Sequence, residues 1–221
     1  MDGRITPATM SIYDALRDRI ITLDIAPGAL LSRAGIMQQF DTSATPIREA
    51  LRALRDEGLV EIHPQASTRV SRIDLSQATQ THFLRSTLEQ AIVAQIAETG
   101  ASGVHAELSS IVELQRDCVA ANDLAGFRQL DLAFHQTLFR ATDRLALYKL
   151  IRRESGHIDR IRALHLPRAD KTAQILTDHD RIVTALRLGD PQLAKERMRL
   201  HLSHTIALGP ALKQEFPAYF V

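Results

Sequence analysis

The sequence has 221 residues, 45% of them hydrophobic, with 27 Lys and Arg against 26 Asp and Glu and a formal net charge of +1. This length suits two modest domains or one large one, and the single cysteine, Cys118, excludes an intramolecular disulfide. No stretch approaches the roughly 18 to 20 apolar residues that span a bilayer, and no signal peptide is evident, so we expect a cytoplasmic protein without a membrane partner.

The N-terminal part of the sequence predicts three helices. Apolar residues at helical spacing indicate a first helix over residues 11–23. Ser32 is a suitable N-cap for a second, short helix. After a tight turn, Thr45 is a suitable N-cap for a third helix with Pro46 in its first position, and Gly58 ends that helix.

Two short β-prone runs follow, over residues 59–63 and 68–71, and predict a hairpin. The order of two helices, a tight turn, a third helix and a hairpin is typical of a winged helix-turn-helix, whose third helix enters the DNA major groove. The sequence therefore predicts a DNA-binding domain at its N-terminal end.

Three arginines of the third predicted helix, Arg48, Arg52 and Arg55, share an arc beside the apolar one. An arginine arc on an arbitrary helix is more often a solvated face. At this position in a winged helix-turn-helix, however, arginines can bind phosphates or the O6 and N7 atoms of guanine. Net charge adds nothing to this argument, because residues 1–73 contain equal numbers of basic and acidic residues.

Downstream of a linker near residues 72–77, the sequence predicts helices only. Their expected ranges are 76–99, 103–121, 123–142, 144–165, 170–188 and 191–212. We expect the chain after Gly209 to lie on the surface as a tail. The predicted fold is mainly α, with a winged helix-turn-helix domain over residues 1–73 and an all-α bundle over residues 74–221.

Four polar residues fall on apolar helix faces of this bundle. Asp131 and His135 lie one turn apart in the predicted helix over residues 123–142, and His179 and His201 lie on two later helices. A buried carboxylate among imidazoles is most economically explained if a divalent cation neutralises it. The pattern therefore predicts a metal site with one aspartate and three histidines.

Each histidine alone would more often be a satisfied core residue, and only the set of four favours a metal. The ligands leave open positions that suit an organic carboxylate. They do not distinguish zinc, nickel, manganese and iron, of which zinc is the preferred candidate. Reserve ligand candidates are His204, His157 and His165, whereas His82 and His105 are expected at or near the surface.

Residues 43–60, SATPIREALRALRDEGLV, resemble the DNA-reading segment of the GntR superfamily of bacterial regulators. The downstream sequence resembles the FadR-type subfamily with its FCD effector-binding domain. The motifs that carry this second resemblance are Leu84-Arg85 with Leu88-Glu89, DLAFH over residues 131–135, Asp178-His179 with Ile182, and Met198 with His201-Leu202.

The resemblance implies a winged-helix domain joined to a six- or seven-helix bundle, and a homodimer that binds a palindromic double-stranded DNA operator. It also implies repression that a small carboxylate relieves. By position, the metal ligands of the family fall on the same four residues, Asp131, His135, His179 and His201. The predicted DNA-contacting residues are Arg33, Ser43, Thr45, Arg48, Arg52 and Arg69.

Arg85 lies where the family often has a cation that faces the effector cavity, and a guanidinium matches the geometry of a carboxylate. We therefore predict that Arg85 binds the effector. The alternative is an ion pair between Arg85 and Glu89, which follows one helical turn later.

Parts of the sequence also fit two other functions. His179-Asp180 is the HD dipeptide of metal-dependent phosphohydrolases, but Asp180 is expected to face away from His179, and the sequence reveals no second inward carboxylate as a general base. A purely structural metal bundle that binds other proteins would leave the N-terminal arginines unexplained. We predict a cytoplasmic transcription regulator, associated with the nucleoid when bound to its operator, and not an enzyme.

Overall fold

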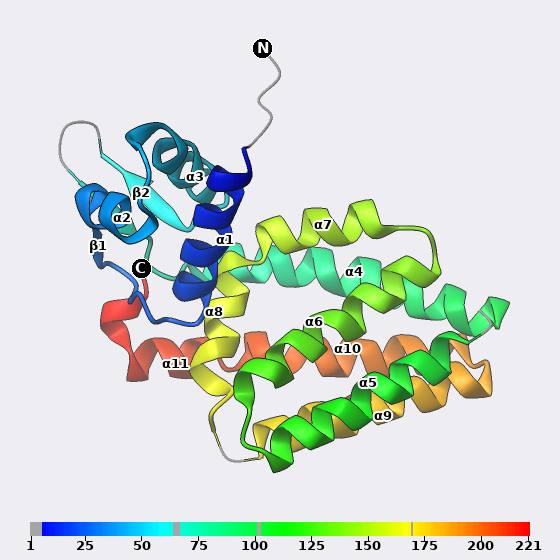
Figure 1. The fold of residues 1–221 in the computed structure, drawn as a ribbon. Coiled ribbons are helices and arrows are strands. Elements are labelled where there is room, and N and C mark those ends of the chain that lie inside the picture. Colours follow the sequence, from blue (N-terminus) through cyan, green and yellow to red (C-terminus); the bar gives the residue numbers. More distant parts are fainter. Residues whose placement is uncertain (1–5, 64–66, 101–102, 169) are drawn as a thin grey trace. The chain divides into compact units, whose positions relative to one another are not determined.

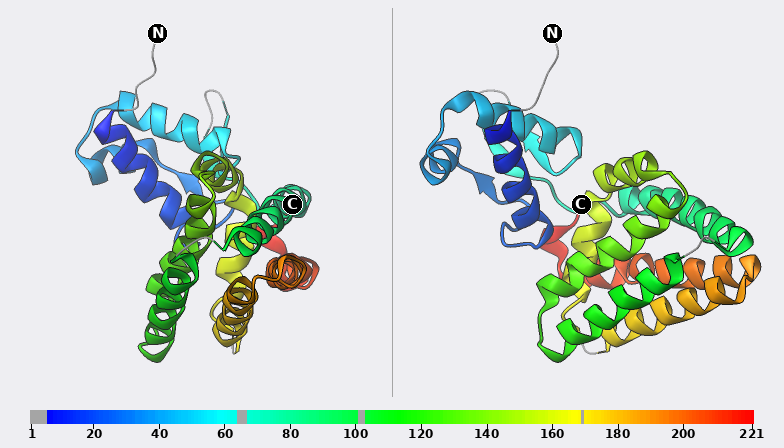
Figure 2. Two further views of the ribbon diagram at one scale, coloured as in Figure 1. Left: turned by 90° about the vertical axis from the view of Figure 1, so that its right-hand side faces the viewer. Right: turned by 45° about the vertical axis from the view of Figure 1, so that its right-hand side comes forward.

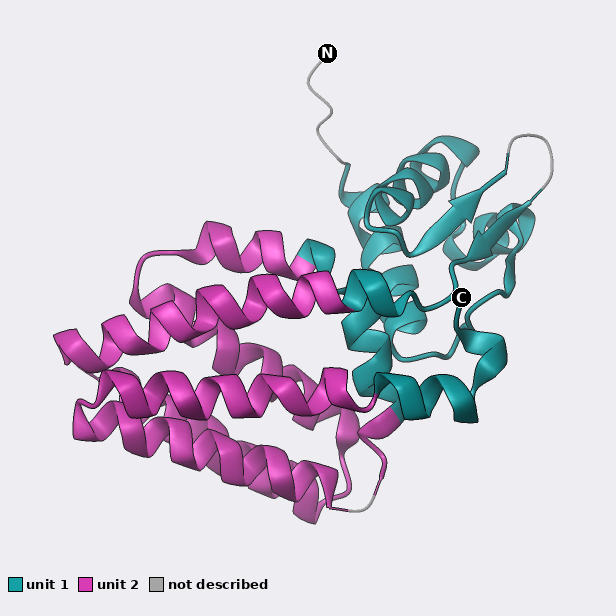
Figure 3. Cartoon of the chain, turned by 180° about the vertical axis from the view of Figure 1, so that it is seen from behind, with its two compact units in different colours: residues 1–78, 153–164, 209–221 teal, residues 79–152, 165–208 magenta. Residues whose placement is uncertain are grey.

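The computed structural model describes residues 6–63, 67–100, 103–168 and 170–221. The chain forms two compact units (Figure 3): unit 1 comprises residues 1–78, 153–164 and 209–221, and unit 2 comprises residues 79–152 and 165–208. None of the described helices combines the length and the apolar character needed to cross a bilayer. Each unit is mainly helical, as the sequence predicts.

Unit 1 begins with three helices (Figure 1), α1 over Pro7–Ile21, α2 over Arg33–Phe40 and α3 over Ala44–Asp56. Ser32 caps α2 as predicted, with its hydroxyl accepting a hydrogen bond from the Gly35 amide at 3.1 Å. The connection between α2 and α3 is tight because Asp41 adopts a left-handed conformation. These helices pack through a core that includes Ile12, Leu16, Ile36, Ile47, Leu51 and Leu54.

The third helix starts two residues earlier than the sequence suggested, at Ala44 and not at Pro46. Its N-cap is Ser43, and Thr45 and Pro46 lie inside the first turn, so the prediction that Thr45 caps the helix is wrong. The Ser43 side chain makes no capping hydrogen bond. Extended backbone at Ser43, rather than side-chain capping, therefore marks the beginning of α3.

Three short strands follow the pattern of a wing. They are β1 over Leu30–Leu31, β2 over Val60–Ile62 and β3 over Thr68–Val70, and they form an antiparallel sheet in the order β1-β3-β2. The hairpin of β2 and β3 confirms the prediction, and the structure places Glu61 opposite Arg69. The two-residue strand β1 was not predicted, because so short a segment has no period of its own.

Unit 1 also contains segments from much later in the chain, most of α8 over Gly156–His165, then α11 over Gly209–Glu215 and a 3-10 turn over Pro217–Tyr219. The prediction that the tail after Gly209 lies on the surface is wrong for part of it. Leu212 and Phe220 are buried, and Phe220 forms a parallel bridge with Ile73. The Ile73 amide donates to the Tyr219 carbonyl at 2.7 Å, and this bond ties the tail to the end of the wing.

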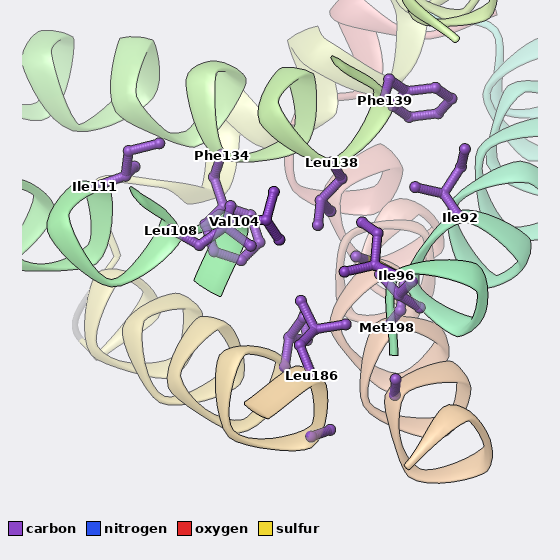
Figure 4. Packing of buried hydrophobic residues seen from close by; sticks show 14 of the residues in the cluster. Ile92, Ile96, Val104, Leu108, Ile111, Phe134, Leu138, Phe139, Leu186 and Met198 are labelled. Atoms are coloured by element: carbon purple, nitrogen blue, oxygen red, sulfur yellow. The ribbon is translucent and has the colours of Figure 1, made fainter. Parts of the chain in front are cut away.

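Unit 2 is a helical bundle. Its helices are α4 over Leu75–Thr99, which begins in unit 1, α5 over Val104–Ala120, α6 over Leu124–Ala141, α7 over Leu145–Glu154, α9 over Lys171–Leu188 and α10 over Pro191–Ala207. Helix α5 lies beside α6, and α9 lies beside α10, in both views of Figure 2. Figure 4 shows Leu108, Phe134 and Leu138 pointing into the shared apolar core of these helices.

The predicted helix over residues 144–165 is in fact two helices, α7 and α8, that meet at Ser155. Gly156 lies directly after the break, where the surrounding packing leaves no room for a side chain. A Cβ atom added at Gly156 would lie 2.6 Å from the Leu59 side chain, closer than van der Waals contact permits. Close packing of this glycine against Leu59 was not evident from the helical spacing of apolar residues.

Candidate metal centre and nucleic-acid interface

The outer side of α3 carries a group of arginines. Together with α2 and the sheet it forms a shallow hollow lined by Arg33, Arg48, Leu51, Arg52, Arg55 and Ile62. We refer to Arg33, Arg48, Arg52 and Arg55 as the arginine face. Among the described residues, Arg48 and Arg52 form no hydrogen bond or ion pair, so both guanidinium groups are available to an anionic partner.

The carboxylates of this region explain how a part of the chain with balanced charge can present an arginine face. Glu49 accepts a hydrogen bond from the Thr9 hydroxyl of α1 at 3.1 Å. Glu57 accepts from Arg17, also on α1, at 2.9 Å, and from the Tyr13 hydroxyl. Burial, and then the hydrogen bond to Glu57, raises the pKa of Tyr13. We call the part of unit 1 from α1 to Ile73 the head, and two of its negative charges are therefore held against α1.

The other predicted DNA-contacting residues lie at separate places in unit 1. Ser43 and Thr45 are exposed at the start of α3, beside amide groups that have no partner within the helix. Arg33 donates to the Thr68 hydroxyl at 3.5 Å. Arg69 lies on β3, donates to the Gly28 carbonyl at 3.3 Å and does not line the same hollow as the arginine face.

The four predicted metal ligands meet in the interior of unit 2. Asp131 and His135 lie on α6, His179 on α9 and His201 on α10, with exposed fractions of 3%, 2%, 0% and 7%. One ligand atom from each residue lies within 4.8 Å of the corresponding atom of every other. We call these four residues the Asp/His cluster. The structure thus brings together the complete set that the sequence predicted.

The distances within the Asp/His cluster are short. The Nε2 atoms of His135 and His201 lie 3.3 Å apart, and Nε2 of His179 lies 3.7 Å from Oδ1 of Asp131. The ring of Phe134, one residue before His135 on α6, stacks on the His179 ring with a centroid distance of 3.8 Å and an interplanar angle of 3°. This stacking therefore constrains the plane of the His179 imidazole.

Two histidines are held by oxygen atoms on the ring nitrogen that points away from the other ligands. Nδ1 of His135 lies 2.5 Å from Oε2 of Glu89 on α4. Nδ1 of His179 lies 2.8 Å from Oε1 of Gln115 on α5. Metal-binding histidines typically have such an outer acceptor, which sets the tautomer and the orientation of the ring.

Glu89 also forms the ion pair with Arg85 that was the alternative to an effector-binding arginine. Nε of Arg85 donates to Oε1 of Glu89 at 2.8 Å, and both side chains are buried. Burial acts to raise the pKa of Glu89, but the charges of Arg85 and His135 outweigh it and hold that pKa well below its usual range. Glu89 is therefore an anion between a guanidinium and an imidazole.

A further carboxylate, Asp178, lies beside His201. Its Oδ2 atom is 3.8 Å from Nδ1 of His201 and 3.2 Å from Nε2 of His204. Burial raises the pKa of Asp178, whereas His201, His204 and Arg181 lower it, and the net direction is downward. His204, a reserve ligand in the sequence analysis, thus contacts Asp178 and is not part of the Asp/His cluster.

The Asp/His cluster fits a divalent ion in the chemistry of its donors. Zinc binds imidazole nitrogen and carboxylate oxygen at about 2.0 to 2.2 Å, so two donors of one ion lie at most roughly 4.2 Å apart. The observed limit of 4.8 Å between ligand atoms needs only small side-chain shifts to reach that spacing. One carboxylate with three imidazoles also suits nickel, manganese and iron.

The remaining candidates lie elsewhere. Nδ1 of His157, in unit 1, accepts a hydrogen bond from the Asp74 amide at 2.9 Å. His165 is buried but does not belong to the Asp/His cluster. Asp180, the second residue of the HD dipeptide, pairs at the surface with Arg116 at 2.5 Å, as expected for a residue facing away from His179.

The expectation that no second carboxylate points inward is wrong, because Glu89 and Asp178 are both buried. Gln115 was also missed as a contact of His179. A signal was present in each helix, since Glu89 precedes Ile92 and Ile96 at helical spacing and Gln115 follows Leu108 and Ile111 in the same way. Polar residues on every apolar stripe, not only histidines and aspartates, indicate partners of a buried site.

Two family models match the sequence. Residues 8–70 match the model described as bacterial regulatory proteins, gntR family, and residues 80–204 match the model of the FCD domain. The first match covers α1 to β3, and the second covers the bundle with all four residues of the Asp/His cluster. The matched stretches agree with the resemblance that the sequence motifs suggested.

Similar proteins are described as transcription regulators. An HTH-type transcriptional regulator in an unstable DNA locus of Streptomyces ambofaciens is 35% identical over 195 residues, which cover 86% of this chain and 80% of that protein. The HTH-type transcriptional repressor RspR of Escherichia coli strain K12 is 28% identical over 214 residues, which cover 97% and 94%. Neither description names an enzyme.

The fold occurs in solved structures. The structure of E. coli McbR/YncC aligns with a TM-score of 0.78 at 19% sequence identity and covers 96% of this chain and 99% of its own. At this identity the likeness concerns the fold alone. It supports a winged helix-turn-helix followed by a helical domain, in agreement with the predicted fold class.

Proposed function

This chain belongs to the GntR family of bacterial regulatory proteins and carries an FCD domain, and from this premise we propose that it is a repressor whose hold on DNA is controlled by a small organic acid. In this proposal the protein binds a palindromic operator as a homodimer. Two recognition helices, one α3 from each protomer, would then contact successive half-sites of the major groove.

The arginine face supports the DNA-binding half of this proposal. Arg48 and Arg52 are exposed on the helix that a winged helix-turn-helix inserts into the major groove. Arg33, Arg69, Ser43 and Thr45 are proposed to contact phosphates, because hydroxyl groups and free amides at a helix N-terminus favour anions. Base contacts by Arg48 would give sequence preference, whereas the phosphate contacts would fix the register.

The Asp/His cluster is the observation that carries the effector half. A carboxylate and three imidazoles in an apolar interior are best neutralised by a divalent cation, and we propose that Asp131, His135, His179 and His201 hold it, with zinc favoured. When bound, the ion would offer a positive charge and open coordination positions to an organic carboxylate.

Arg85 remains the proposed protein cation for the effector carboxylate. Its Nε atom donates to Glu89, so an effector carboxylate would have to bind beside this ion pair. Because linkage is reciprocal, an effector that prefers one arrangement of the protein changes operator affinity by its difference in affinity for the two arrangements.

The proposal is tested by selecting bound duplexes from a random DNA pool with the full chain and then measuring affinity for the selected sequence. Arg48→Ala should weaken binding by roughly 1 to 3 kcal/mol, the value of a bidentate base contact. The matched control is Arg140→Ala, which removes an exposed arginine of unit 2. Parent-like binding by Arg48→Ala would show that α3 does not read the DNA as proposed.

Metal analysis of the same preparations tests the second half. His179→Ala should lose most of its bound divalent metal and its response to carboxylates, while retaining affinity for the selected DNA. His105→Ala, which removes an exposed histidine of α5, should keep the parent metal content. Full metal content in His179→Ala would exclude the Asp/His cluster as the site.

A further inference from the structure

We propose that Glu89 and Gln115 are positioning residues of the metal centre, which hold His135 and His179 in the one tautomer that can bind a cation. The inference rests on the proposed metal centre and extends it from the four ligands to the residues that prepare them. It follows from which nitrogen of each ring faces an acceptor and which faces the other ligands.

The contact between Glu89 and His135 leaves one arrangement of protons. Oε1 of Glu89 accepts from Arg85 at 2.8 Å, and Oε2 lies 2.5 Å from Nδ1 of His135. An ionised carboxylate can only accept hydrogen bonds, so Nδ1 of His135 carries a hydrogen. In the neutral ring, Nε2 of His135 then carries a lone pair and no hydrogen. This Nε2 atom lies 3.3 Å from Nε2 of His201.

In the contact between Gln115 and His179, Nδ1 of the ring again faces an oxygen atom, but the acceptor is a neutral amide. Oε1 of Gln115 lies 2.8 Å from Nδ1 of His179, and both side chains have an exposed fraction of 0%. The stacked Phe134 ring fixes the plane of the imidazole, so Nε2 is directed toward Oδ1 of Asp131 at 3.7 Å. A hydrogen on Nε2 would occupy the space that the cation needs.

The two outer partners differ in charge, and this difference predicts unequal effects. A carboxylate that accepts from Nδ1 makes the ring a stronger donor at Nε2 than an amide oxygen does, because negative charge is transferred toward the ring. His135 should therefore be the strongest imidazole ligand of the cluster. Loss of Glu89 should weaken metal binding more than loss of Gln115.

The affinity experiment uses the full chain and Co²⁺, with a chelator of known affinity as competitor. Removing an outer partner of a metal ligand typically costs 10- to 100-fold in metal affinity, so we expect Glu89→Leu near the upper value and Gln115→Leu near the lower. The matched control is Glu98→Leu, which replaces an exposed glutamate on the same helix α4. A Co²⁺ dissociation constant in Glu89→Leu equal to that of the control would overturn the proposal.

A double variant separates positioning from folding. Glu89→Leu alone deprives the buried Arg85 of the negative charge of its neighbour, which should lower the unfolding midpoint. Adding Arg85→Met removes that charge, so the midpoint should recover while the Co²⁺ dissociation constant stays raised. If the double variant regains the parent affinity, Glu89 acts only through stability and the proposal is wrong.

The tautomers can be read without any metal. In chelator-treated parent protein near pH 8, the ring ¹⁵N shifts of His135 and His179 should report hydrogen on Nδ1 in both rings. Hydrogen on Nε2 in either ring would contradict the proposal. Because this measurement needs no bound ion, it tests the positioning residues even if the parent binds no Co²⁺, a result that would reject the metal centre itself.

Discussion

The arginine face of unit 1 and the Asp/His cluster of unit 2 are built in opposite ways. Arg48 and Arg52 project from α3 and form no hydrogen bond or ion pair among the described residues. His135 and His179, in contrast, are buried and held by acceptors from neighbouring helices. One site consists of side chains on a single surface, and the other consists of contacts among five helices, α4, α5, α6, α9 and α10.

This difference determines how each site should respond to substitution. An exposed arginine can be removed at little cost in stability, so its loss should appear almost entirely in DNA affinity. A residue of the buried site has partners that lose a hydrogen bond when it is removed, so stability and binding should change together. The predictions below test whether the separation also holds for the residues that support each site.

The largest effect is expected at Arg160, a fully buried residue of α8 that joins the end of the wing. It donates to the Ser71 carbonyl at 2.6 Å, to the Ser71 hydroxyl at 3.2 Å and to the Gly156 carbonyl at 3.1 Å. Arg160→Ala leaves these acceptors unsatisfied and opens a cavity, so we expect a loss of roughly 3 to 5 kcal/mol in the free energy of unfolding. Urea denaturation measures it.

The matched control is Arg153→Ala, which removes an exposed arginine of the same unit that pairs with its neighbour Glu154. Such a surface change should cost less than about 0.5 kcal/mol. If the two variants are equally stable, the hydrogen bonds of Arg160 do not contribute to the stability of unit 1.

Much of the fold was predictable because local patterns agree with long-range packing. The helical spacing of Ile12, Leu16 and Ile20 places all three in the core of the head. Prediction failed where a distant segment decides the conformation. Gly156 begins α8 directly after the break and packs closely against Leu59, and the buried Phe220 pairs with Ile73. Neither partner is close in sequence, so no local pattern could indicate the contact.

The four residues of the Asp/His cluster were predictable from the sequence, whereas their partners Glu89 and Gln115 were not. Asp131 and His135 are recognisable because they interrupt an apolar stripe at a spacing that chelates a metal. Gln115 interrupts a stripe in the same way, but an amide binds metals poorly and so carries no chemical indication of its role. Only the structure shows that its oxygen meets His179.

The second prediction concerns pH and His157, which supports the head through its unprotonated Nδ1 atom. Burial, and then the charge of Arg160, lowers the pKa of His157 to about 4 from an ordinary value of 6.5. Below pH 6.5 His157 binds a proton in the unfolded chain, whereas in the folded chain it binds one only near pH 4. The free energy of unfolding therefore falls as the pH falls from 6.5 to about 4. The shift corresponds to about 3 kcal/mol at most.

The test compares the parent with His157→Asn, whose side-chain oxygen can still accept from the Asp74 amide but cannot titrate. Urea denaturation between pH 7 and pH 4 should give a shallower loss of stability in the variant, while other groups titrate alike in both proteins. Identical pH profiles would mean that His157 is protonated in the folded head and that Nδ1 is not held as an acceptor.

The smallest effects are expected at two helix caps, one in each region. Ser32 accepts from the Gly35 amide at the start of α2, and Asp190 accepts from the amides of Gln192 and Leu193 at the start of α10. Substitution by alanine should cost about 1 kcal/mol in each case, with the larger loss at Asp190, whose charge also favours the helix N-terminus.

Asparagine at either position keeps an acceptor and should retain most of the stability, which makes Ser32→Asn and Asp190→Asn the matched controls. His201 lies about three turns along α10 from Asp190, too far for fraying of the first turn to reach it. Asp190→Ala should therefore leave the Co²⁺ dissociation constant unchanged. If that constant rises, the ligands of the Asp/His cluster depend on the whole length of α10, and contacts from neighbouring helices alone do not hold them in place.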